Sequence, residues 1–256
     1  MISKKSSTNS TNSHTHECIS HWSQSFIGRH VYADMQETFG AVNVDGIDFP
    51  DDLADFDRSD YNRGDYDLVI HLAAFANIRE SLDDPHKFYE NNVEKARKLF
   101  DWCRETDTLL IYASSSAVDG EYWENPYAMT KWINEVMAPP NSIGMRLTTV
   151  YGENSRADMM YRMLEDKTAT YVTNHTRDWI HVDDVCRAIR YLAAHKIRGP
   201  VSVGTGVSVS VKELANKMGM GHLPVKELTP GERQDNTADI KMLCSTGWFP
   251  TRSVLL

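Results

Sequence analysis

The hydrophobic positions of the chain alternate between the period of a helix and the continuous apolar runs of buried strands. Apolar residues recur every four positions over 27–39, and Gly40 stands where a helix C-cap glycine belongs. A short strand is expected over 41–44, ending at Asp45, and a buried strand over 68–74. The first part of the chain therefore predicts a helix followed by two strands.

The same alternation continues through the middle of the chain. An amphipathic helix is expected over 85–104, and further strands are expected over 109–113 and 144–150, with a helix starting near Tyr127 between them. Strands that alternate with helices are joined by right-handed crossovers and form a parallel sheet covered on both faces. The pattern predicts an α/β fold with a doubly wound parallel sheet.

After residue 150 the regularity changes. A helix is expected from Asp183, a short strand at 201–203, and a second helix after Ser210, which forms a capping box with Glu213. These shorter pieces predict a small, interleaved C-terminal domain. We expect the main domain to comprise residues 17–150 and 179–205, and the smaller domain to comprise residues 151–178 and 206–256.

The first sixteen residues differ from the rest. Residues 1–16 are rich in Ser, Thr, Asn and His and contain almost nothing apolar, so they cannot bury enough surface to order themselves. We expect a disordered tail there. Four candidate metal ligands in or beside the tail lack the spacing of a zinc module, and no metal site is expected; they are His14, His16, Cys18 and His21.

Composition and charge exclude several classes of function. The chain is 41% hydrophobic and 25% charged, as ordinary globular proteins are. Its formal net charge is -9, with Lys and Arg scattered along the chain, which argues against a nucleic-acid surface. No apolar run approaches membrane-spanning length, and the four cysteines form no close pair. We expect a cytoplasmic protein that binds neither nucleic acid nor membrane.

The strongest chemical signal lies around Tyr127 and Lys131. On a helix these two residues share a face, and a nearby positive charge favours phenolate, so the pKa of the tyrosine is expected to fall. Serines 114–116 follow the strand at 109–113 and place a hydroxyl at its carboxyl end, where it can orient an alcohol or ketone. The pattern predicts a Ser/Tyr/Lys proton-transfer centre.

Further segments stand in a characteristic order along the chain. They are SFIGRHV at 25–31, VIHLAA at 69–74 with RES at 79–81, YENNV at 89–93, YASSSAV at 112–118, PYAMTK at 126–131, MRLTTVYG at 145–152, TRDWIHVDDV at 176–185, and AD at 238–239 with GWFP at 247–250. Together they resemble the extended short-chain dehydrogenase/reductase family, and within it the nucleotide-sugar epimerases and dehydratases. The resemblance extends from about residue 17 to the C-terminus.

The resemblance implies a Rossmann domain that binds NAD and a smaller domain that binds a nucleotide sugar. It implies that Tyr127 is the acid/base, that Lys131 binds the nicotinamide ribose, and that Ser115 binds the sugar hydroxyl. Asp45 would hold the adenosine ribose hydroxyls, which favours NAD over NADP. The implied cofactor-binding residues are Ser25, Phe26, Ile27, Gly28, Asp45, Ala73, Ala74, Asn92 and Lys131, and the implied substrate-binding residues are Ser81, Thr149, Arg177 and Arg233.

Two of these positions have alternative interpretations. Arg177 is expected to meet the substrate diphosphate, the alternative being a surface ion pair with Asp178 or Asp183. For His71, inside a buried strand, we expect a hydrogen-bonded core residue.

The chain also departs from the family pattern. With Gly28 at the third glycine of the dinucleotide fingerprint, Trp22 stands at the first and Ser25 at the second, so only the glycine that allows close helix packing remains. Thr229 stands where an arginine is expected before Pro230, and Arg233 is a candidate substitute. The connections after Asp45 and Gly120 are short, which predicts a more open or a reduced substrate pocket.

These features favour an NAD-dependent nucleotide-sugar epimerase that removes a hydride from a sugar carbon and returns it to the other face. Dehydratases of the family carry an Asp-Glu pair after the catalytic serine or threonine, whereas Ser116-Ala117 follow here. The alternatives are a nucleotide-sugar ketoreductase and a non-catalytic binding protein, the latter favoured by Trp22 and Ser25. The helices at 85–104 and 127–137 carry more apolar surface than one sheet face usually needs, and the resemblance implies that they pair with the same helices of a second copy, so we expect a C2 homodimer.

Overall fold

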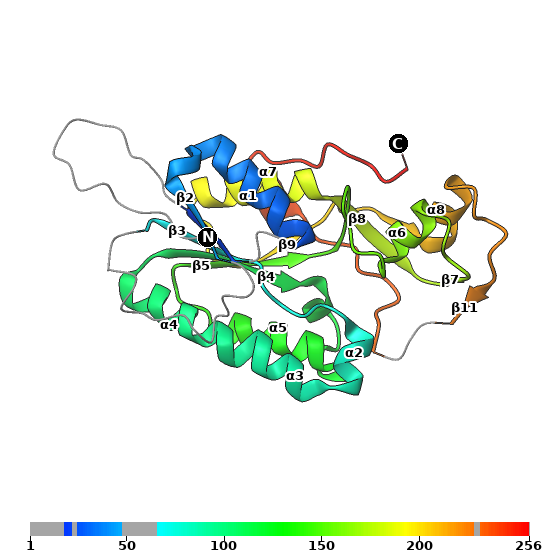
Figure 1. Cartoon of the computed structure of the whole chain (residues 1–256), viewed down its shortest axis with the longest axis horizontal. Coiled ribbons are helices and arrows are strands. Elements are labelled where there is room, and N and C mark those ends of the chain that lie inside the picture. The colour runs from blue at the N-terminus through cyan, green and yellow to red at the C-terminus, as the bar shows by residue number, and fades with distance from the viewer. Residues whose placement is uncertain (1–17, 22–24, 48–65, 228–230, 256) are drawn as a thin grey trace.

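The main feature of the fold is a six-stranded parallel sheet with helices on both faces, as Figure 1 shows for the computed structural model. The structure describes residues 18–21, 25–47, 66–227 and 231–255. The strand order is β2-β1-β3-β4-β5-β9, and all neighbouring strands are parallel. The predicted doubly wound sheet is confirmed. The strands are β1 Cys18–His21, β2 Val44–Ile47, β3 Leu68–His71, β4 Leu109–Ser115, β5 Ser142–Leu147 and β9 Gly199–Val203.

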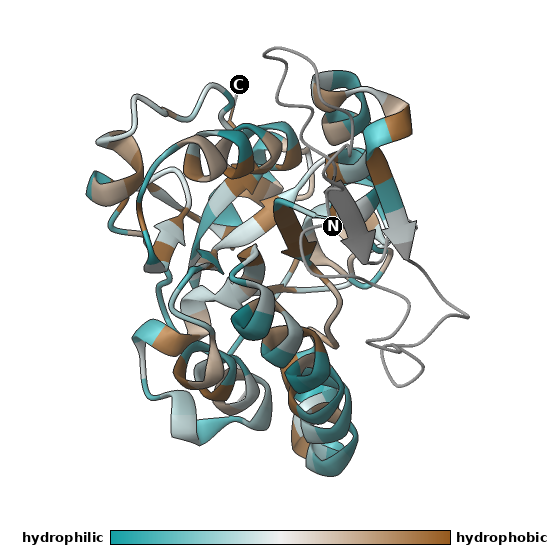
Figure 2. Cartoon of the chain, turned by 90° about the vertical axis from the view of Figure 1, so that its left-hand side faces the viewer, coloured by the Kyte–Doolittle hydropathy of each residue, from teal (hydrophilic) through white to brown (hydrophobic). Residues whose placement is uncertain are grey.

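Two layers of helices cover the sheet. α1 (Phe26–Phe39) and α7 (Val182–Ala194) lie on one face, and α4 (Ala96–Thr106) and α5 (Pro126–Met137) lie on the other (Figure 1). Hydrophilic and hydrophobic residues alternate along these helices, as expected of helices that cover a sheet (Figure 2). The shorter helices beside α5 are α2 Ile78–Asp83 and α3 Pro85–Tyr89, and short 3-10 segments occupy η5 Ser116–Asp119 and η6 Tyr122–Glu124.

Most predicted elements are confirmed, with local differences. The helix expected over 85–104 is present as α3 and α4, joined by a π-helical segment, η4 (Glu90–Lys95). The strand expected over 41–44 is wrong for its first three residues, which form a 3-10 turn, η1 (Ala41–Asn43). Gly40 has a φ of 86° and Asn43 donates its side-chain amide to the carbonyl of Phe39, so the chain turns tightly before β2 begins.

The strand expected over 144–150 is divided between two sheets. β5 ends at Leu147, Thr148 donates its amide to the carbonyl of Val203, and β6 (Thr149–Tyr151) joins a second sheet of order β10-β8-β6. The other strands and helices of this part are β7 Val172–Thr173, β8 Thr176–His181, β10 Ser208–Ser210, β11 Val225–Lys226, α6 Met160–Glu165, α8 Val211–Lys217 and α9 Lys241–Cys244. Ser210 caps α8 by accepting the amide of Glu213 at 3.0 Å, as predicted.

Buried apolar residues form two clusters. The larger one fills the space between the six-stranded sheet and its helices, and the smaller one lies among α6, α8 and the short strands. His71 is buried and lies edge-on to Phe100, a member of the larger cluster, at 6.0 Å between ring centres, as expected of a core residue. Its expected hydrogen bond stays a prediction. The division into two domains at the boundaries given above stays a prediction. Within the described residues, no helix is both long and apolar enough to span a membrane.

One buried carboxylate joins the C-terminal segment to α7. The Asp184 side chain is 0% exposed. It accepts the amides of Thr251 and Arg252 at 3.0 Å each, the Thr251 hydroxyl at 2.7 Å, and Arg187 at 2.7 Å. The backbone carbonyl of Asp184 also accepts the indole N–H of Trp248. This residue therefore fixes the end of the chain against the helix.

We predict that Asp184→Ala lowers the free energy of unfolding by about 3 kcal/mol, because buried donors lose their acceptor. Urea denaturation measures the change. Asp183→Ala is the matched control, since its neighbouring side chain is 45% exposed and pairs with Arg252 at the surface. For Asp183→Ala we expect the free energy of unfolding to fall by less than about 1 kcal/mol. Equal losses of unfolding free energy in the two variants would contradict the conclusion that Asp184 fixes the end of the chain against α7.

Candidate functional site

A cavity of about 320 Å³ opens at the carboxyl ends of the central strands. Its walls are the residues after β3, the end of β4, the β5–β6 junction, the start of α1 and the first turns of α5. Its far side comes from the segments around Arg156, Arg177 and 231–236. Ligands of doubly wound sheets bind at this edge, where loops from neighbouring strands diverge.

The cavity brings together ten of the residues predicted from the sequence. Those that line it are Ser25, Phe26, Ile27, Ala74, Ser115, Tyr127, Lys131, Thr149, Arg177 and Arg233. Five predicted residues do not line it: Gly28, Asp45, Ala73, Ser81 and Asn92. The roles of all of these residues stay predictions.

Local sequence sets the position of α5. Asn125 caps the helix by accepting the amide of Ala128 at 2.7 Å, and Pro126 occupies its first turn. Asn125 also donates to the carbonyl of Gly231 at 2.9 Å, which ties the start of α5 to the far side of the cavity. Ser81, predicted to bind substrate, is buried and accepts the amide of Tyr127 at 3.2 Å. In this structure it holds the backbone that carries Tyr127.

Tyr127 and Lys131 lie close together, but their electrostatics differ from the expectation. Burial raises the pKa of Tyr127, while a hydrogen bond from Ser115 and the charge of Arg156 act to lower it. The predicted net fall is therefore wrong. Lys131 is buried beside the tyrosine, and burial lowers its pKa to about 7, so it brings only a partial positive charge. Its amine donates to the carbonyl of Ala113 at 2.8 Å.

Ser115 lies at the end of β4 beside Tyr127. Its oxygen accepts the amide of Ala117 at 3.2 Å, and its hydroxyl is near enough to the phenol of Tyr127 to act to lower the pKa of the phenol. The two hydroxyl groups therefore face the cavity side by side. This arrangement can hold a substrate alcohol or carbonyl oxygen and exchange a proton with it.

The start of α1 forms the opposite wall. Ser25 caps this helix by accepting the amide of Gly28 at 3.1 Å, and Ser25, Phe26 and Ile27 line the cavity. The amides of a helix N-terminus attract anions such as a pyrophosphate. Trp22, at the altered fingerprint position, lies outside the described residues. With Lys131 and the small side chain of Ala74 nearby, this wall fits a dinucleotide.

Of the four predicted cofactor residues that do not line the cavity, Asn92 and Asp45 have side-chain partners within the protein. Asn92, in the π-helical segment, accepts the amide of Phe75 at 2.9 Å and donates to its carbonyl at 3.0 Å, so it fixes the loop that carries Ala74. Asp45 is exposed on β2, the strand paired with β1, and its carboxylate accepts the hydroxyl of Tyr66 at 3.0 Å. Asp45 thus occupies the expected strand but already has one protein partner.

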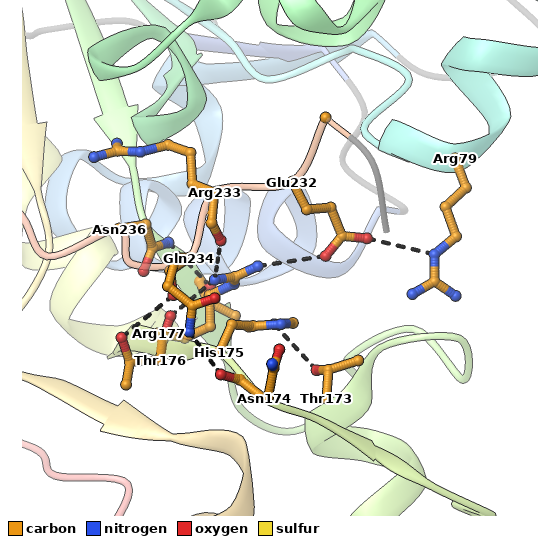
Figure 3. A network of polar contacts seen from close by, with 12 residues as sticks. Arg79, Thr173, Asn174, His175, Thr176, Arg177, Glu232, Arg233, Gln234 and Asn236 are labelled. Carbon is orange, nitrogen blue, oxygen red and sulfur yellow. Dashed lines mark hydrogen bonds and ion pairs between the residues drawn. The ribbon is translucent and has the colours of Figure 1, made fainter. Parts of the chain in front are cut away.

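Arg177 lies in a polar network at the far side of the cavity (Figure 3). It donates to the carbonyls of Thr176 and Arg233 at 2.8 Å each and pairs with Glu232 at 3.4 Å. The alternative of an ion pair with Asp178 or Asp183 is wrong, because Arg177 pairs with Glu232 and Asp178 instead accepts backbone amides. Burial lowers the pKa of Arg177 to about 10.

Sequence reasoning missed several residues that line the cavity. Asn236 donates to the hydroxyls of Ser116 and Thr149 at 3.3 Å each, and so joins the start of η5 to β6. Arg156 lines the cavity and is the charge that acts on the Tyr127 phenol. Both lie in irregular segments without a periodic pattern. The described residues contain no group of three or more His, Cys, Asp or Glu side chains that could hold a metal.

Comparisons with known proteins agree with this geometry. The chain is 33% identical over 168 residues to an uncharacterised protein of Methanocaldococcus jannaschii, covering 54% of this chain and 52% of that protein. It is 28% identical over 236 residues to a putative UDP-glucose 4-epimerase of the same organism, covering 78% and 77%. The first three curated relatives are each matched over about half of their length.

A solved structure shows the same fold. The UDP-glucuronic acid 4-epimerase of Bacillus cereus, in complex with UDP-glucuronic acid and NAD, is similar with a TM-score of 0.78 at 20% identity, covering 94% of this chain and 96% of that one. The model of the NAD dependent epimerase/dehydratase family matches residues 52–204, more than half of the 256 residues. NAD, expected from the resemblance, is therefore the cofactor of the matching family. The chain belongs to the NAD dependent epimerase/dehydratase family.

Proposed function

We propose that the protein is a nucleotide-sugar epimerase in which Tyr127 moves the proton of the reacting hydroxyl. The observation that carries this proposal is the pairing of Tyr127 with Ser115 at the wall of the cavity. Among the described residues that line the cavity, none is Asp, Glu or His. A dehydratase needs an acid and a base beyond the tyrosine, whereas epimerisation through a ketone needs only one proton carrier. The composition of the wall supports the epimerase.

The chain's own residues supply binding, orientation and proton transfer. Ser115 orients the sugar hydroxyl, and the phenolate form of Tyr127 accepts its proton, a form that the Ser115 hydrogen bond and Arg156 favour. NAD, when bound, supplies a nicotinamide ring that accepts a hydride and returns it. The sugar ketone must turn before Tyr127 gives the proton back. A more open far side of the cavity would leave room for that rotation.

A ketoreductase is the second candidate. Burial raises the pKa of Tyr127, and the protonated phenol is the form that donates to a ketone. The two candidates use the same residues and differ in whether the hydride returns to the sugar from which it came. The non-catalytic binding protein remains the third interpretation, and the experiments below separate it from both.

The substrate that we propose is a nucleotide sugar whose sugar carries a carboxylate. Arg177 and Arg233 lie together at the far side of the cavity and suit a diphosphate. Arg156 is a third cation, close enough to Tyr127 to lower its pKa, and a neutral sugar would leave this charge without a partner on the substrate. The similar B. cereus structure was solved with UDP-glucuronic acid, which has such a carboxylate.

The homodimer predicted from the sequence also remains a proposal. Apolar side chains are exposed on the helical layer that contains α2–α5, with Val136 on α5 64% exposed and Trp123 60% exposed. A partner copy that packs on this layer would cover them. The exposed apolar residues of this layer are Leu82, Tyr89, Trp123 and Val136.

Replacing Tyr127 with Phe tests the proton carrier. We expect Tyr127→Phe to lower turnover of the nucleotide sugar on the order of a hundredfold or more, with little change in the melting temperature, because only the hydroxyl is lost. Tyr122→Phe is the control, since Tyr122 stacks on Trp132 away from the cavity. Unchanged activity in the Tyr127 variant would rule out the role. A wild type inert toward nucleotide sugars with saturating NAD would favour the binding protein.

The choice of cofactor is tested at Asp45. A carboxylate that accepts ribose hydroxyls loses these bonds and repels the charge when a 2'-phosphate is present, so NAD should bind at least about tenfold more tightly than NADP. Asp45→Ala should narrow this ratio in calorimetric titrations. Asp101→Ala, which changes an exposed carboxylate on α4, should leave it unchanged. Equal affinities of the wild type for the two cofactors would refute the role of Asp45.

The sugar is tested at Arg156. We expect Arg156→Ala to lower kcat/KM for UDP-glucuronic acid by about tenfold or more, and that for UDP-glucose much less, because only the acid loses an ionic contact. Asp158→Ala removes the carboxylate that pairs with Arg156 at 3.1 Å and should not reduce the preference for the acid. If both sugars lose activity equally, Arg156 acts through Tyr127 alone and the proposed substrate class is wrong.

A further inference from the structure

Three residues of α5, spaced four apart, contact three consecutive residues of β4. Tyr127 lies beside Ser115 at the cavity, Lys131 donates to the carbonyl of Ala113 at 2.8 Å, and the Glu135 carboxylate accepts the hydroxyl of Ser114 at 2.5 Å. Residues four apart lie on one face of a helix, so this stripe of α5 faces the carboxyl end of β4. The functions described above use Tyr127 and Lys131 but give no role to Glu135.

Glu135 is held by two neighbouring strands at once. Its side chain is 6% exposed, and Arg146 on β5 donates to both of its oxygens, at 2.9 and 2.6 Å. Ser114 and Arg146 are register partners in adjacent parallel strands, so their side chains project from the same face of the sheet. The carboxylate on α5 receives both of them. Three hydrogen bonds therefore fix one point of the helix over two strands.

The same arginine also reaches the segment that follows Ser115. A second arm of Arg146 donates to Asp119 at 2.5 Å, in the 3-10 turn that begins directly after the serine. The chain on either side of the Tyr127–Ser115 contact is thus tied to one guanidinium. Arg146 contacts α5 through Glu135 and the segment after β4 through Asp119.

Stability alone does not explain this arrangement. A buried carboxylate and its guanidinium are expensive to desolvate, and an apolar pair of the same size often replaces them without loss of stability. What such a bidentate pair provides is fixed geometry, because the two planar groups meet in one orientation. A reaction that transfers a proton between fixed groups is sensitive to shifts of about 1 Å, which can cost about a hundredfold in rate.

We propose that Glu135 is a positioning residue, which holds α5 against β4 and β5 so that the Tyr127 phenol stays beside Ser115 at the wall of the cavity. This inference rests on the proposed role of Tyr127 in proton transfer. Glu135 itself does not line the cavity. It acts through Ser114 and Arg146, and the proposal concerns the distance between the phenol and the serine rather than a direct contact with substrate.

The sign of a change in the Tyr127 pKa separates positioning from simple electrostatics. Removing a negative charge near a phenol favours phenolate and lowers its pKa, whereas moving the phenol away from Ser115 removes an influence that lowers the pKa and therefore raises it. Glu135→Ala removes both the charge and the geometry, and Glu135→Gln removes the charge but keeps an oxygen that accepts from Ser114. We expect a higher Tyr127 pKa in Glu135→Ala and an unchanged or lower one in Glu135→Gln.

The measurement is an ultraviolet titration of the phenolate, in which each variant is compared with the same variant carrying Tyr127→Phe. In parallel, kcat should fall by about tenfold or more in Glu135→Ala, with a smaller change in KM. Glu135→Gln should retain more of the wild-type kcat than Glu135→Ala does. The titration needs no turnover. An inert wild type would therefore refute the proposed function, while the titration would still decide the role of Glu135.

Ser114→Ala decides the case if Glu135→Ala does not fold. It removes one donor and no charge, so a rise in the Tyr127 pKa with a fall in kcat of about threefold or more supports positioning. Lys212→Met, which breaks hydrogen bonds to the carbonyls of Gly221 and Leu223 far from the site, controls for lost stability and should change neither quantity. A folded Ser114→Ala protein with the pKa and kcat of the wild type would overturn the proposal.

Discussion

The packing of α5 on β4 is the contact on which the site depends. It places the Tyr127 phenol against Ser115 and the Lys131 amine against the carbonyl of Ala113. The contact is unfavourable in one respect, because it buries an amine that would be charged in water. The protein accommodates this by a change of protonation, since burial lowers the pKa of Lys131 to about 7, where the neutral amine can still donate to a carbonyl. The same burial makes the phenol of Tyr127 harder to ionise.

The local parts of this arrangement could be predicted from the sequence and the electrostatic parts could not. The spacing of Tyr127 and Lys131 fixes their common helical face, and Asn125-Pro126 fixes where the helix starts. Spacing does not reveal burial, so the predicted fall of the Tyr127 pKa was wrong. It also does not reveal partners distant in sequence. Arg177 pairs with Glu232, 55 residues away, and Asn236 reaches Ser116 over 120 residues.

Charge divides the cavity into two unlike halves. The wall formed by α5 and β4 is nearly neutral, whereas Arg156, Arg177 and Arg233 line the far side of a protein with a net charge of -9. Positive charge gathered in one cavity against that background focuses anions there. Glu232 offsets part of this charge, and Figure 3 shows it between Arg79 and Arg177, at 3.4 Å from each. Its carboxylate lies outside the cavity lining, so the arginines remain the groups that an anionic substrate meets.

The altered glycine fingerprint is compatible with an anion site at α1, as the conformation of Ser25 indicates. Ser25 has φ and ψ of -69° and 164°, an extended conformation that any residue adopts, so the serine needs no glycine-like freedom there. Its hydroxyl caps the helix by accepting the amide of Gly28, a bond that stabilises a helix start by about 1 kcal/mol. Attraction of a pyrophosphate comes from the backbone amides and the helix dipole, neither of which depends on the side chain at this position. The substitution at residue 25 therefore changes how closely a dinucleotide can approach, while the feature that attracts it is retained.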